Sequence, residues 1–165
     1  MSDIEAIIRP FAPGDRDMVN EFFDQMGPES KLFFNSTDGN RQTAMKFWDE
    51  ADAGINKNAR YFAATIPNED GGELMVGYVF LWKMTTKVPS LGICIRDGYK
   101  GKHLGTRLME TARQCAIDNG CGGIMLTTHF ANTRAQALYK KCGFERLGIA
   151  SAACEFLYLL RLPNE

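Results

Sequence analysis

The 165-residue sequence lacks several features that mark specialised classes of protein. It has no run of about eighteen uninterrupted apolar residues, so we expect no membrane-spanning helix. Its first residues include acidic side chains and no apolar stretch, so we expect no secretory signal. The five cysteines form no CxxC pair and are accompanied by only two histidines, which argues against a zinc site or a disulfide framework. These absences predict buried free thiols in a reducing compartment, no bound metal and a cytoplasmic location.

An excess of either charge is also missing. Nineteen Lys and Arg residues stand against twenty Asp and Glu residues, which gives a formal net charge of −1. Proteins that bind nucleic acid or anionic membranes through charge carry a basic excess, so neither partner is expected. The hydrophobic fraction of 45% and the charged fraction of 24% are typical of a globular protein, and the length fits one domain over residues 1–165.

Hydrophobic periodicity predicts a mixed α/β fold in the order strand, two helices, three strands, helix, strand, helix, two strands. Runs of branched and aromatic residues predict strands over 4–12, 59–66, 74–84, 90–96, 123–130, 144–147 and 154–162. Helical spacing predicts helices that follow Asp15 and that cover 41–53, 104–119 and 132–142. The second half should therefore contain crossovers around one sheet. The apolar final strand, Phe156 to Leu162, is predicted as an edge that could pair in a homodimer.

The segment from Ile93 to Leu108 contains a pattern typical of anion binding. A predicted strand ends, a basic turn with glycines follows, and a long helix begins, so amide groups at the start of the helix point outward. This arrangement binds phosphate or pyrophosphate. Glycines at 101 and 105 allow close approach, and the charges of Lys100, Lys102 and Arg107 are expected to add attraction. The segment matches neither GxxxxGK[ST] nor GxGxxG, which excludes two common phosphate loops.

Two blocks in this sequence resemble those of the GNAT acetyltransferases. The turn Lys100-Gly-Lys-His-Leu-Gly105 resembles the [QR]-x-x-G-x-[GA] motif of that family. About thirty residues later, Asn132…Ala135…Leu138-Tyr139…Gly143-Phe144 is similar to its N…A…LY…GF block. The resemblance implies a GNAT fold, which is a mixed, mostly antiparallel sheet of about seven strands flanked by about four helices. It also implies a cleft for acetyl-CoA between the fourth and fifth strands.

The same resemblance assigns roles to residues of this chain. The backbone of Ile93 to Ile95 would pair with the pantetheine arm, and the turn from Lys100 to Thr106 would wrap the pyrophosphate. Asn132 would contact the cofactor, and Tyr139 would be the general acid that protonates the departing thiolate, although an aromatic that only fills the cleft floor is an alternative. The implied cofactor residues are Ile93, Cys94, Ile95, Lys100, Gly101, Lys102, His103, Leu104, Gly105, Thr106, Asn132 and Tyr139.

This chain departs from the family pattern at two positions of the turn. His103 stands where the family has its first motif glycine. A side chain there must point away from the phosphates or contact them, and we expect a residue other than glycine to be tolerated only if φ stays negative. Lys100 replaces the usual Arg or Gln, which keeps the charge and loses the bidentate fork.

The general base is a third departure. Thr127, twelve residues before Tyr139, stands where the ribosomal-protein N-terminal acetyltransferase branch has a glutamate. Glu73, Glu155, Glu29 and His129 remain as candidates, and a chain of water molecules is equally suitable.

The predicted activity is acetyl-CoA-dependent N-acetyl transfer, by direct transfer in a ternary complex. The acceptor would be a primary amine on a small molecule or at a peptide or protein N-terminus. One alternative is a non-catalytic acyl-CoA-binding or sensing module on the same fold, which the missing base permits. Another is an unrelated α/β domain whose basic turn binds a different phosphate ligand.

Overall fold

The computed structural model describes residues 5–33, 42, 46, 58–101, 103–150 and 154–163. The helix predicted over 41–53 lies outside these residues except for Gln42 and Lys46, which are both helical. The strands are β1 (Ile7–Pro10), β2 (Ala59–Pro67), β3 (Glu73–Trp82), β4 (Ser90–Ile95), β5 (Gly123–His129), β6 (Glu145–Ile149) and β7 (Glu155–Arg161). The helices are the 3₁₀ turn η1 (Pro13–Asp15), α1 (Arg16–Asp24), α2 (Pro28–Phe33), α4 (Leu104–Asp118) and α5 (Thr133–Lys141).

The strands form one seven-stranded sheet in the order β1-β2-β3-β4-β5-β7-β6. Each neighbouring pair is antiparallel except β4 and β5, which run parallel. This topology confirms the predicted fold class. The prediction that Phe156 to Leu162 is an edge was wrong, because β7 pairs with β5 on one side and β6 on the other. A strand with an apolar sequence is typical of a sheet interior, and the exposed Leu147 and Ile149 belong to the real edge, β6.

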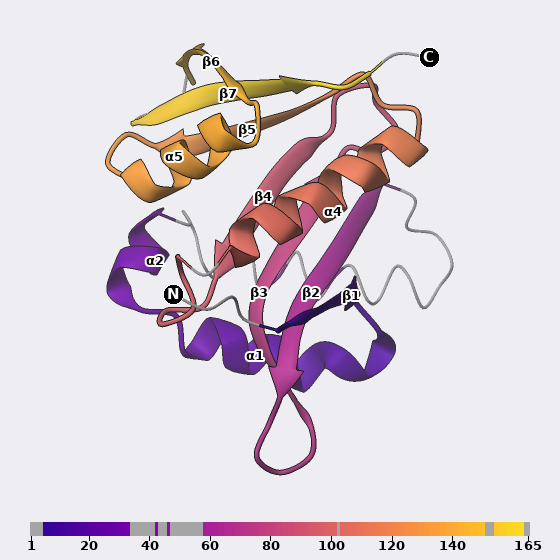
Figure 1. Ribbon diagram of the computed structural model, residues 1–165, viewed down its shortest axis with the longest axis vertical. Helices are drawn as coiled ribbons and strands as arrows, with labels where there is room; N and C mark the ends of the chain where they lie inside the picture. Colours follow the sequence, from indigo (N-terminus) through magenta and orange to yellow (C-terminus); the bar gives the residue numbers. More distant parts are fainter. Residues whose placement is uncertain are drawn as a thin grey trace.

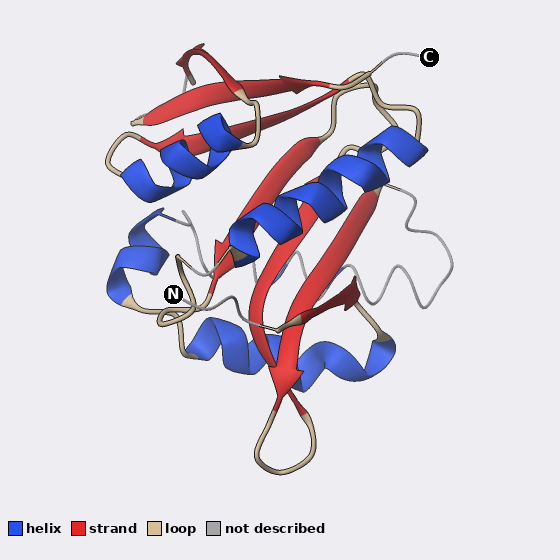
Figure 2. Cartoon of the chain, viewed as in Figure 1, coloured by secondary structure: helices blue, strands red, loops and turns tan. Residues whose placement is uncertain are grey.

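Helices cover both faces of the sheet (Figures 1 and 2). The long helix α4 crosses one face, where Leu104, Leu108 and Ala112 follow helical spacing and are fully buried. On the other face α1 buries Val19, Phe22 and Phe23 against aromatic residues of β2 and β3. Two apolar cores therefore sandwich the sheet and fix the position of each strand.

The strands β4 and β5 pair over an unusually short length. Among the described residues, the two strands share one register position, Ser90 with Met125, and the Met125 amide donates to the Pro89 carbonyl at 3.0 Å. By contrast, β3 and β4 pair over six positions. Beyond Ser90 the sheet therefore splits into two parts, and the helix α5 lies beside the β5–β7 part (Figure 1).

The five cysteines are free thiols, but the prediction that they are buried holds only for Cys94 and Cys121, because Cys115 and Cys142 are half-buried and Cys154 is exposed. No helix among the described residues combines the length and the apolar character needed to cross a bilayer.

Candidate active site

A cavity of about 340 Å³ lies where β4 and β5 diverge. Its walls come from β4, β5, α2, the turn before α4 and the helices α4 and α5. Ten of the twelve residues that the resemblance assigned to the cofactor line this cavity. The ten are Ile93, Cys94, Ile95, Lys100, Gly101, His103, Gly105, Thr106, Asn132 and Tyr139.

The other two assigned residues have different outcomes. Lys102 lies outside the described residues. Leu104 is only 1% exposed and belongs to the core beneath α4, so its side chain does not line the cavity. The reason is its position as the first residue of the amphipathic helix, four residues before the buried Leu108.

The strand β4 turns alternate backbone groups toward the cavity. The Arg96 amide donates to Val76 on β3 at 2.8 Å, whereas the Pro89 carbonyl faces β5. Because neighbouring residues of a strand direct their amide and carbonyl groups to opposite edges, those of Ile93 and Ile95 face the β5 side, beyond the point where the two strands pair. Cys94, between them, also lines the cavity.

The segment between β4 and α4 has left-handed backbone at three described positions, Gly98, Gly101 and His103. Gly101 has φ of 76° and His103, the residue that caps α4, has φ of 61° and ψ of 6°. The prediction of a negative φ at His103 was wrong: the chain reverses into the helix here, and this turn takes the left-handed conformation even without glycine. His103 is exposed and lines the cavity, and whether its ring contacts the phosphates of a bound cofactor stays a prediction.

Gly105 sits at a close contact between two helices and a strand. A Cβ atom at this position would lie 3.0 Å from Leu138 Cδ2 on α5 and 3.3 Å from Ile95 Cδ1 on β4. Glycine therefore lets the first turn of α4 approach both walls of the cavity.

A hydrogen-bonded network ties the turn to α2. The Asp97 carboxylate accepts from the Gly27 amide at 2.9 Å and from the Ser30 hydroxyl at 2.8 Å, and Lys100 Nζ donates to Ser30 Oγ at 2.9 Å. Burial by itself would raise the pKa of the Asp97 carboxyl, but the Ser30 hydrogen bond and the Lys100 charge outweigh burial and hold this pKa below its ordinary value. The neighbouring Arg96 pairs with Glu21 of α1, so two consecutive residues hold the helices against the end of β4.

The positive charge around the cavity differs from the predicted set. Arg107 donates to the Ala6 carbonyl at 2.7 Å and does not line the cavity, so the expectation that it adds charge there was wrong. Two residues that sequence reasoning missed, Arg134 and Lys141, line it instead. They lie seven residues apart on one face of α5, a spacing that the sequence itself displays.

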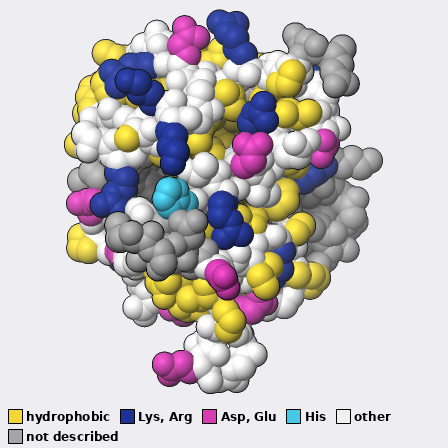
Figure 3. Space-filling view, in the orientation of Figure 1, with side chains coloured by type: hydrophobic (Ala, Val, Ile, Leu, Met, Phe, Trp, Pro, Cys, Tyr) yellow, Lys and Arg dark blue, Asp and Glu magenta, His cyan; other side chains and the backbone are white. Residues whose placement is uncertain are grey.

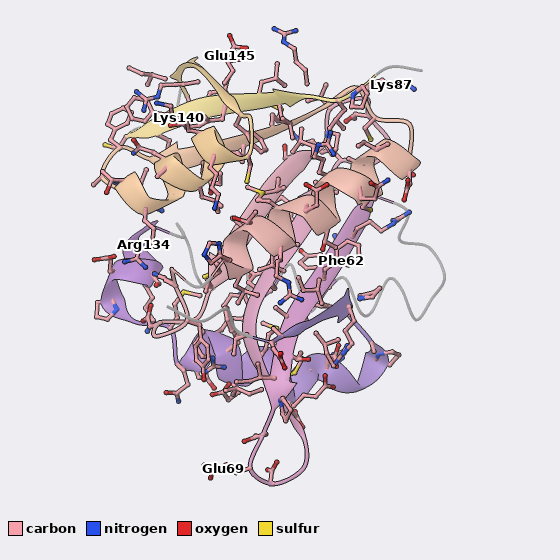
Figure 4. All side chains as sticks on the ribbon, in the orientation of Figure 1. Phe62, Glu69, Lys87, Arg134, Lys140 and Glu145 are labelled. Atoms are coloured by element: carbon pink, nitrogen blue, oxygen red, sulfur yellow. The ribbon has the colours of Figure 1, made fainter. Side chains whose placement is uncertain are left out.

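The figures show how these charges lie. Lys and Arg side chains gather around a histidine on the face seen in Figure 3. Arg134 lies between the first turn of α5 and α2, whereas Lys140 lies on the opposite side of the same helix (Figure 4).

Tyr139 is the buried phenol of the cavity, with 6% exposure. It follows from the local fold: Asn132 Oδ1 accepts from the Ala135 amide at 3.3 Å and begins α5, which places Tyr139 two turns later over the sheet. Burial, reinforced by nearby Cys94, raises the pKa of Tyr139 well above its ordinary value, while a hydrogen bond between the Tyr139 and Thr128 side chains acts in the opposite direction. The phenol is therefore protonated at neutral pH and can donate a proton.

Cys94 is a weak candidate for a nucleophile. Burial raises the pKa of its thiol to about 12, and the charge of Lys100 lowers it only in part. A thiol in this environment carries almost no thiolate at neutral pH.

Of the four candidate bases, Glu29 alone lines the cavity. His129 Nδ1 accepts from the Ala131 amide at 3.0 Å, which is a structural role at the end of β5. Glu73 lies at the β2–β3 hairpin, where hydrogen bonds from Arg9 and Thr65 lower its pKa. Glu155 begins β7 and is paired in register with His129. Within the described ranges, no three His, Cys, Asp or Glu side chains are grouped closely enough to hold a metal ion.

Known proteins share parts of this sequence. Glucosamine 6-phosphate N-acetyltransferase 1 of Dictyostelium discoideum is 37% identical over 57 residues, which cover 34% of this chain and 34% of that protein. Thialysine N-epsilon-acetyltransferase of Bos taurus is 28% identical over 86 residues, which cover 49% of this chain and 51% of that protein. The matches thus span between a third and a half of the length of these relatives.

Solved structures share the fold across nearly the whole chain. An acetyltransferase of the GNAT family from Streptococcus pneumoniae superposes with a TM-score of 0.72 at 22% identity, covering 96% of this chain and 100% of that one. An N-acetyltransferase from Thermoplasma acidophilum, solved in complex with coenzyme A, gives a TM-score of 0.75 at 14% identity, covering 96% and 99%. The sequence profile of the Acetyltransferase (GNAT) family matches residues 19–144, and with the two motif blocks and the divided sheet already described, this places the chain in that family.

Proposed function

We propose that this protein is an acetyl-CoA-dependent N-acetyltransferase that moves an acetyl group to a primary amine by direct transfer in a ternary complex. The observation that carries the proposal is the cavity between β4 and β5, which joins a basic turn at a helix N-terminus to a buried, protonated tyrosine. The relatives support an amine acceptor, because their names specify N-acetyl transfer to an amino sugar phosphate and to a lysine analogue.

The chemistry of the cavity lining fits the parts of acetyl-CoA. The pantetheine arm contains amide groups, and the amide and carbonyl groups of Ile93 and Ile95 face the cavity in a strand conformation that can pair with them. The pyrophosphate is an anion, and the first turn of α4 offers amide groups and a positive dipole end beside Gly101, Gly105 and Thr106. Lys100 adds a charge that Ser30 holds at the cavity rim.

In the proposed reaction, acetyl-CoA supplies an acetyl group activated as a thioester. Amide groups of β4 are donors that can stabilise negative charge as it develops on the carbonyl oxygen. The attacking amine forms the C–N bond and gives up a proton to water or to Glu29, the carboxylate that lines the cavity. As the C–S bond breaks, the Tyr139 hydroxyl donates a proton to the sulfur, and solvent then restores that proton to Tyr139.

A second candidate function is an acyl-CoA-binding module that performs no transfer. The observation in its favour is the position of the candidate bases, since Glu73, Glu155 and His129 all lie away from the cavity. Such a module would keep the binding surface of β4 and the turn, and would leave the amine unacetylated.

The decisive assay measures release of free coenzyme A from acetyl-CoA by the purified chain. The acceptors are glucosamine 6-phosphate, a lysine analogue and a peptide with a free N-terminus, and a reaction without amine is the control. We expect amine-dependent release, with a mass increase of one acetyl group on the acceptor. Binding of coenzyme A without transfer to any acceptor would support the module. Binding of ATP by a chain that does not bind coenzyme A would contradict both functions.

A further inference from the structure

Thr128 places a buried hydroxyl in an apolar row of β5. Ile124 and Leu126 lie on the same face of this strand at two-residue spacing, are 1% and 3% exposed, and belong to the same core as Tyr139. Thr128 is the next residue in this row and is 4% exposed. Burial of a hydroxyl costs free energy unless the hydroxyl is hydrogen-bonded, so a polar side chain at this position requires a partner.

The partner is the hydroxyl of Tyr139. A hydrogen bond joins the Thr128 and Tyr139 side chains, and both residues line the cavity. The backbone of Thr128 is in register with Phe156 of β7, so the sheet fixes Thr128, whereas Tyr139 is carried by α5. The hydrogen bond therefore holds the phenol in place relative to the sheet.

Three further polar groups near Tyr139 are less suited to orient it. They are the thiols of Cys94 and Cys142 and the phenol of Tyr158. A thiol is a weak hydrogen-bond donor. The Tyr158 hydroxyl already accepts from a guanidinium group at 3.3 Å, on the side of its own ring away from the cavity lining. Thr128 is thus the neighbour best suited to fix the direction of the Tyr139 proton.

We propose that Thr128 is a positioning residue, whose hydroxyl donates to the Tyr139 oxygen and so directs the phenolic proton toward the sulfur of the departing thiolate. The inference rests on the proposed function, in which Tyr139 is the general acid. A threonine hydroxyl rotates to donate or to accept, but once the Tyr139 proton has moved to the sulfur, the phenolate oxygen can only accept. Thr128 keeps its own proton throughout, and its hydrogen bond stabilises the negative charge on Tyr139 until solvent returns a proton.

Two pairs of variants isolate the effect of the hydroxyl. The wild type and Thr128→Val have side chains of the same shape, and Thr128→Ser and Thr128→Ala form a second pair that differs by the hydroxyl alone. Steady-state release of coenzyme A by the full chain gives kcat and the KM for the amine, and titration gives the dissociation constant for acetyl-CoA.

Within each pair, loss of the hydroxyl should lower kcat about three- to tenfold, which is the effect of one hydrogen bond to the reacting group. Thr128→Ser should stay within about twofold of the wild type in kcat, because it keeps the donor. The dissociation constant and the KM should change by less than about twofold in all variants, because the hydrogen bond acts on the proton transfer and not on binding.

A double-mutant cycle with Tyr139→Phe separates positioning from a structural role. In the Tyr139→Phe background, Thr128→Val should lower kcat by less than about twofold, because the group that it orients is gone. Thermal melts of all variants check the fold. Thr65→Val is the matched control, since Thr65 is 1% exposed on β2, lies outside the cavity and donates to Glu73 at 2.7 Å. Its kcat should equal that of the wild type.

Equal kcat within both pairs would overturn the inference and leave the proposed function intact. An equal fall in kcat for Thr128→Val with and without the Tyr139 hydroxyl would also overturn it, because Thr128 would then act independently of the phenol. If Thr128→Val does not fold, the serine and alanine pair decides, alone and in the Tyr139→Phe background. A wild type that binds coenzyme A but transfers no acetyl group to any amine would contradict the proposed function, and the inference falls with it.

Discussion

The two walls of the cavity present different chemistry. The β4 wall offers mainly backbone groups, from Ile93, Ile95 and the turn that follows, whereas the wall of β5 and α5 offers side chains such as Asn132 and Tyr139. Backbone groups are available whatever the side chain, so the first wall tolerates changes in sequence, and His103 stands there in place of a motif glycine. We infer that the first wall serves binding and the second serves chemistry, which mutations on each side can separate.

The largest expected effect is on the α5 wall, in Tyr139→Phe. This change keeps the ring and removes the proton donor, and a positioned general acid contributes about 10² to 10⁴ in rate. A thiolate, with a thiol pKa of about 8.5, is already a fair leaving group, so we expect kcat to fall by roughly 10- to 300-fold. The dissociation constant for acetyl-CoA should change by less than about threefold.

Steady-state thiol release and direct titration of acetyl-CoA measure the two quantities. Tyr158→Phe is the matched control, since Tyr158 packs against Tyr139 from β7 and its hydroxyl accepts from Arg146, outside the cavity. Full activity of Tyr139→Phe would mean that Tyr139 contributes only packing. Loss of acetyl-CoA binding with kcat preserved would mean that Tyr139 serves binding and not proton transfer.

The next effect is on the β4 wall, in Gly105→Val. The sequence suggested that a branched side chain here would meet the pyrophosphate, and the structure adds a second clash, with Leu138 and Ile95. Valine should push α4 away from α5 and weaken coenzyme A binding at least about tenfold. Titration measures the affinity, and circular dichroism checks the fold.

Gly148→Val on β6 is the control for this change, because nothing lies within 4 Å of a Cβ atom at Gly148. Its affinity should equal that of the wild type. Unchanged affinity in Gly105→Val would show that the phosphates bind away from this turn.

A smaller effect is expected in Ser30→Ala. The Ser30 hydroxyl accepts from Lys100 and donates to Asp97, so it fixes the ammonium at the cavity rim. Without it Lys100 must be ordered when the anion binds, and we expect coenzyme A affinity to fall about two- to fivefold. Thr111→Ala, which removes a hydroxyl bonded to the Arg107 carbonyl on the exposed side of α4, should leave the affinity unchanged. An equal loss in both variants would refute a specific role for Ser30.

The smallest effect concerns pH and Asp97. The pKa of Asp97 is lowered in the folded state, so its contribution to stability is present above the ordinary aspartate pKa of about 3.9 and is lost as the pH falls through the lowered value. The Tm of the wild type should therefore be higher than that of Asp97→Asn at pH 7, and this difference in Tm should become smaller below about pH 4. A difference in Tm that stays constant across this pH range would show that the charge of Asp97 does not hold α2 in place.

The sequence predicted the fold well because the signals for it are local. The order of the strands and of the helices α1, α4 and α5 followed from periodicity, and the helix start at Asn132 and the basic turn were visible in short segments. The helix α2 (Pro28–Phe33) was not predicted. Features that depend on distant segments were missed. Nothing near Asp97 in the sequence indicates Ser30, which lies 67 residues earlier, and Arg107 is drawn from the turn by the carbonyl of Ala6, 101 residues away.

Two other errors have backbone geometry as their cause. The φ of His103 depends on how the chain leaves β4 and enters α4, which residue type alone does not determine. The edge position of β6 depends on which side of β7 each neighbour occupies, and the apolar pattern of β7 is equally compatible with an edge or an interior strand.

The central claim is that the cavity between β4 and β5 binds acetyl-CoA with its thioester end beside Tyr139. A crystal structure of the full chain with coenzyme A tests this most directly. The account predicts the pyrophosphate against the turn from Lys100 to Thr106, the pantetheine arm along Ile93 to Ile95, and the sulfur within hydrogen-bonding reach of the Tyr139 hydroxyl. Coenzyme A bound outside this cavity, or with its sulfur directed away from Tyr139, would contradict it.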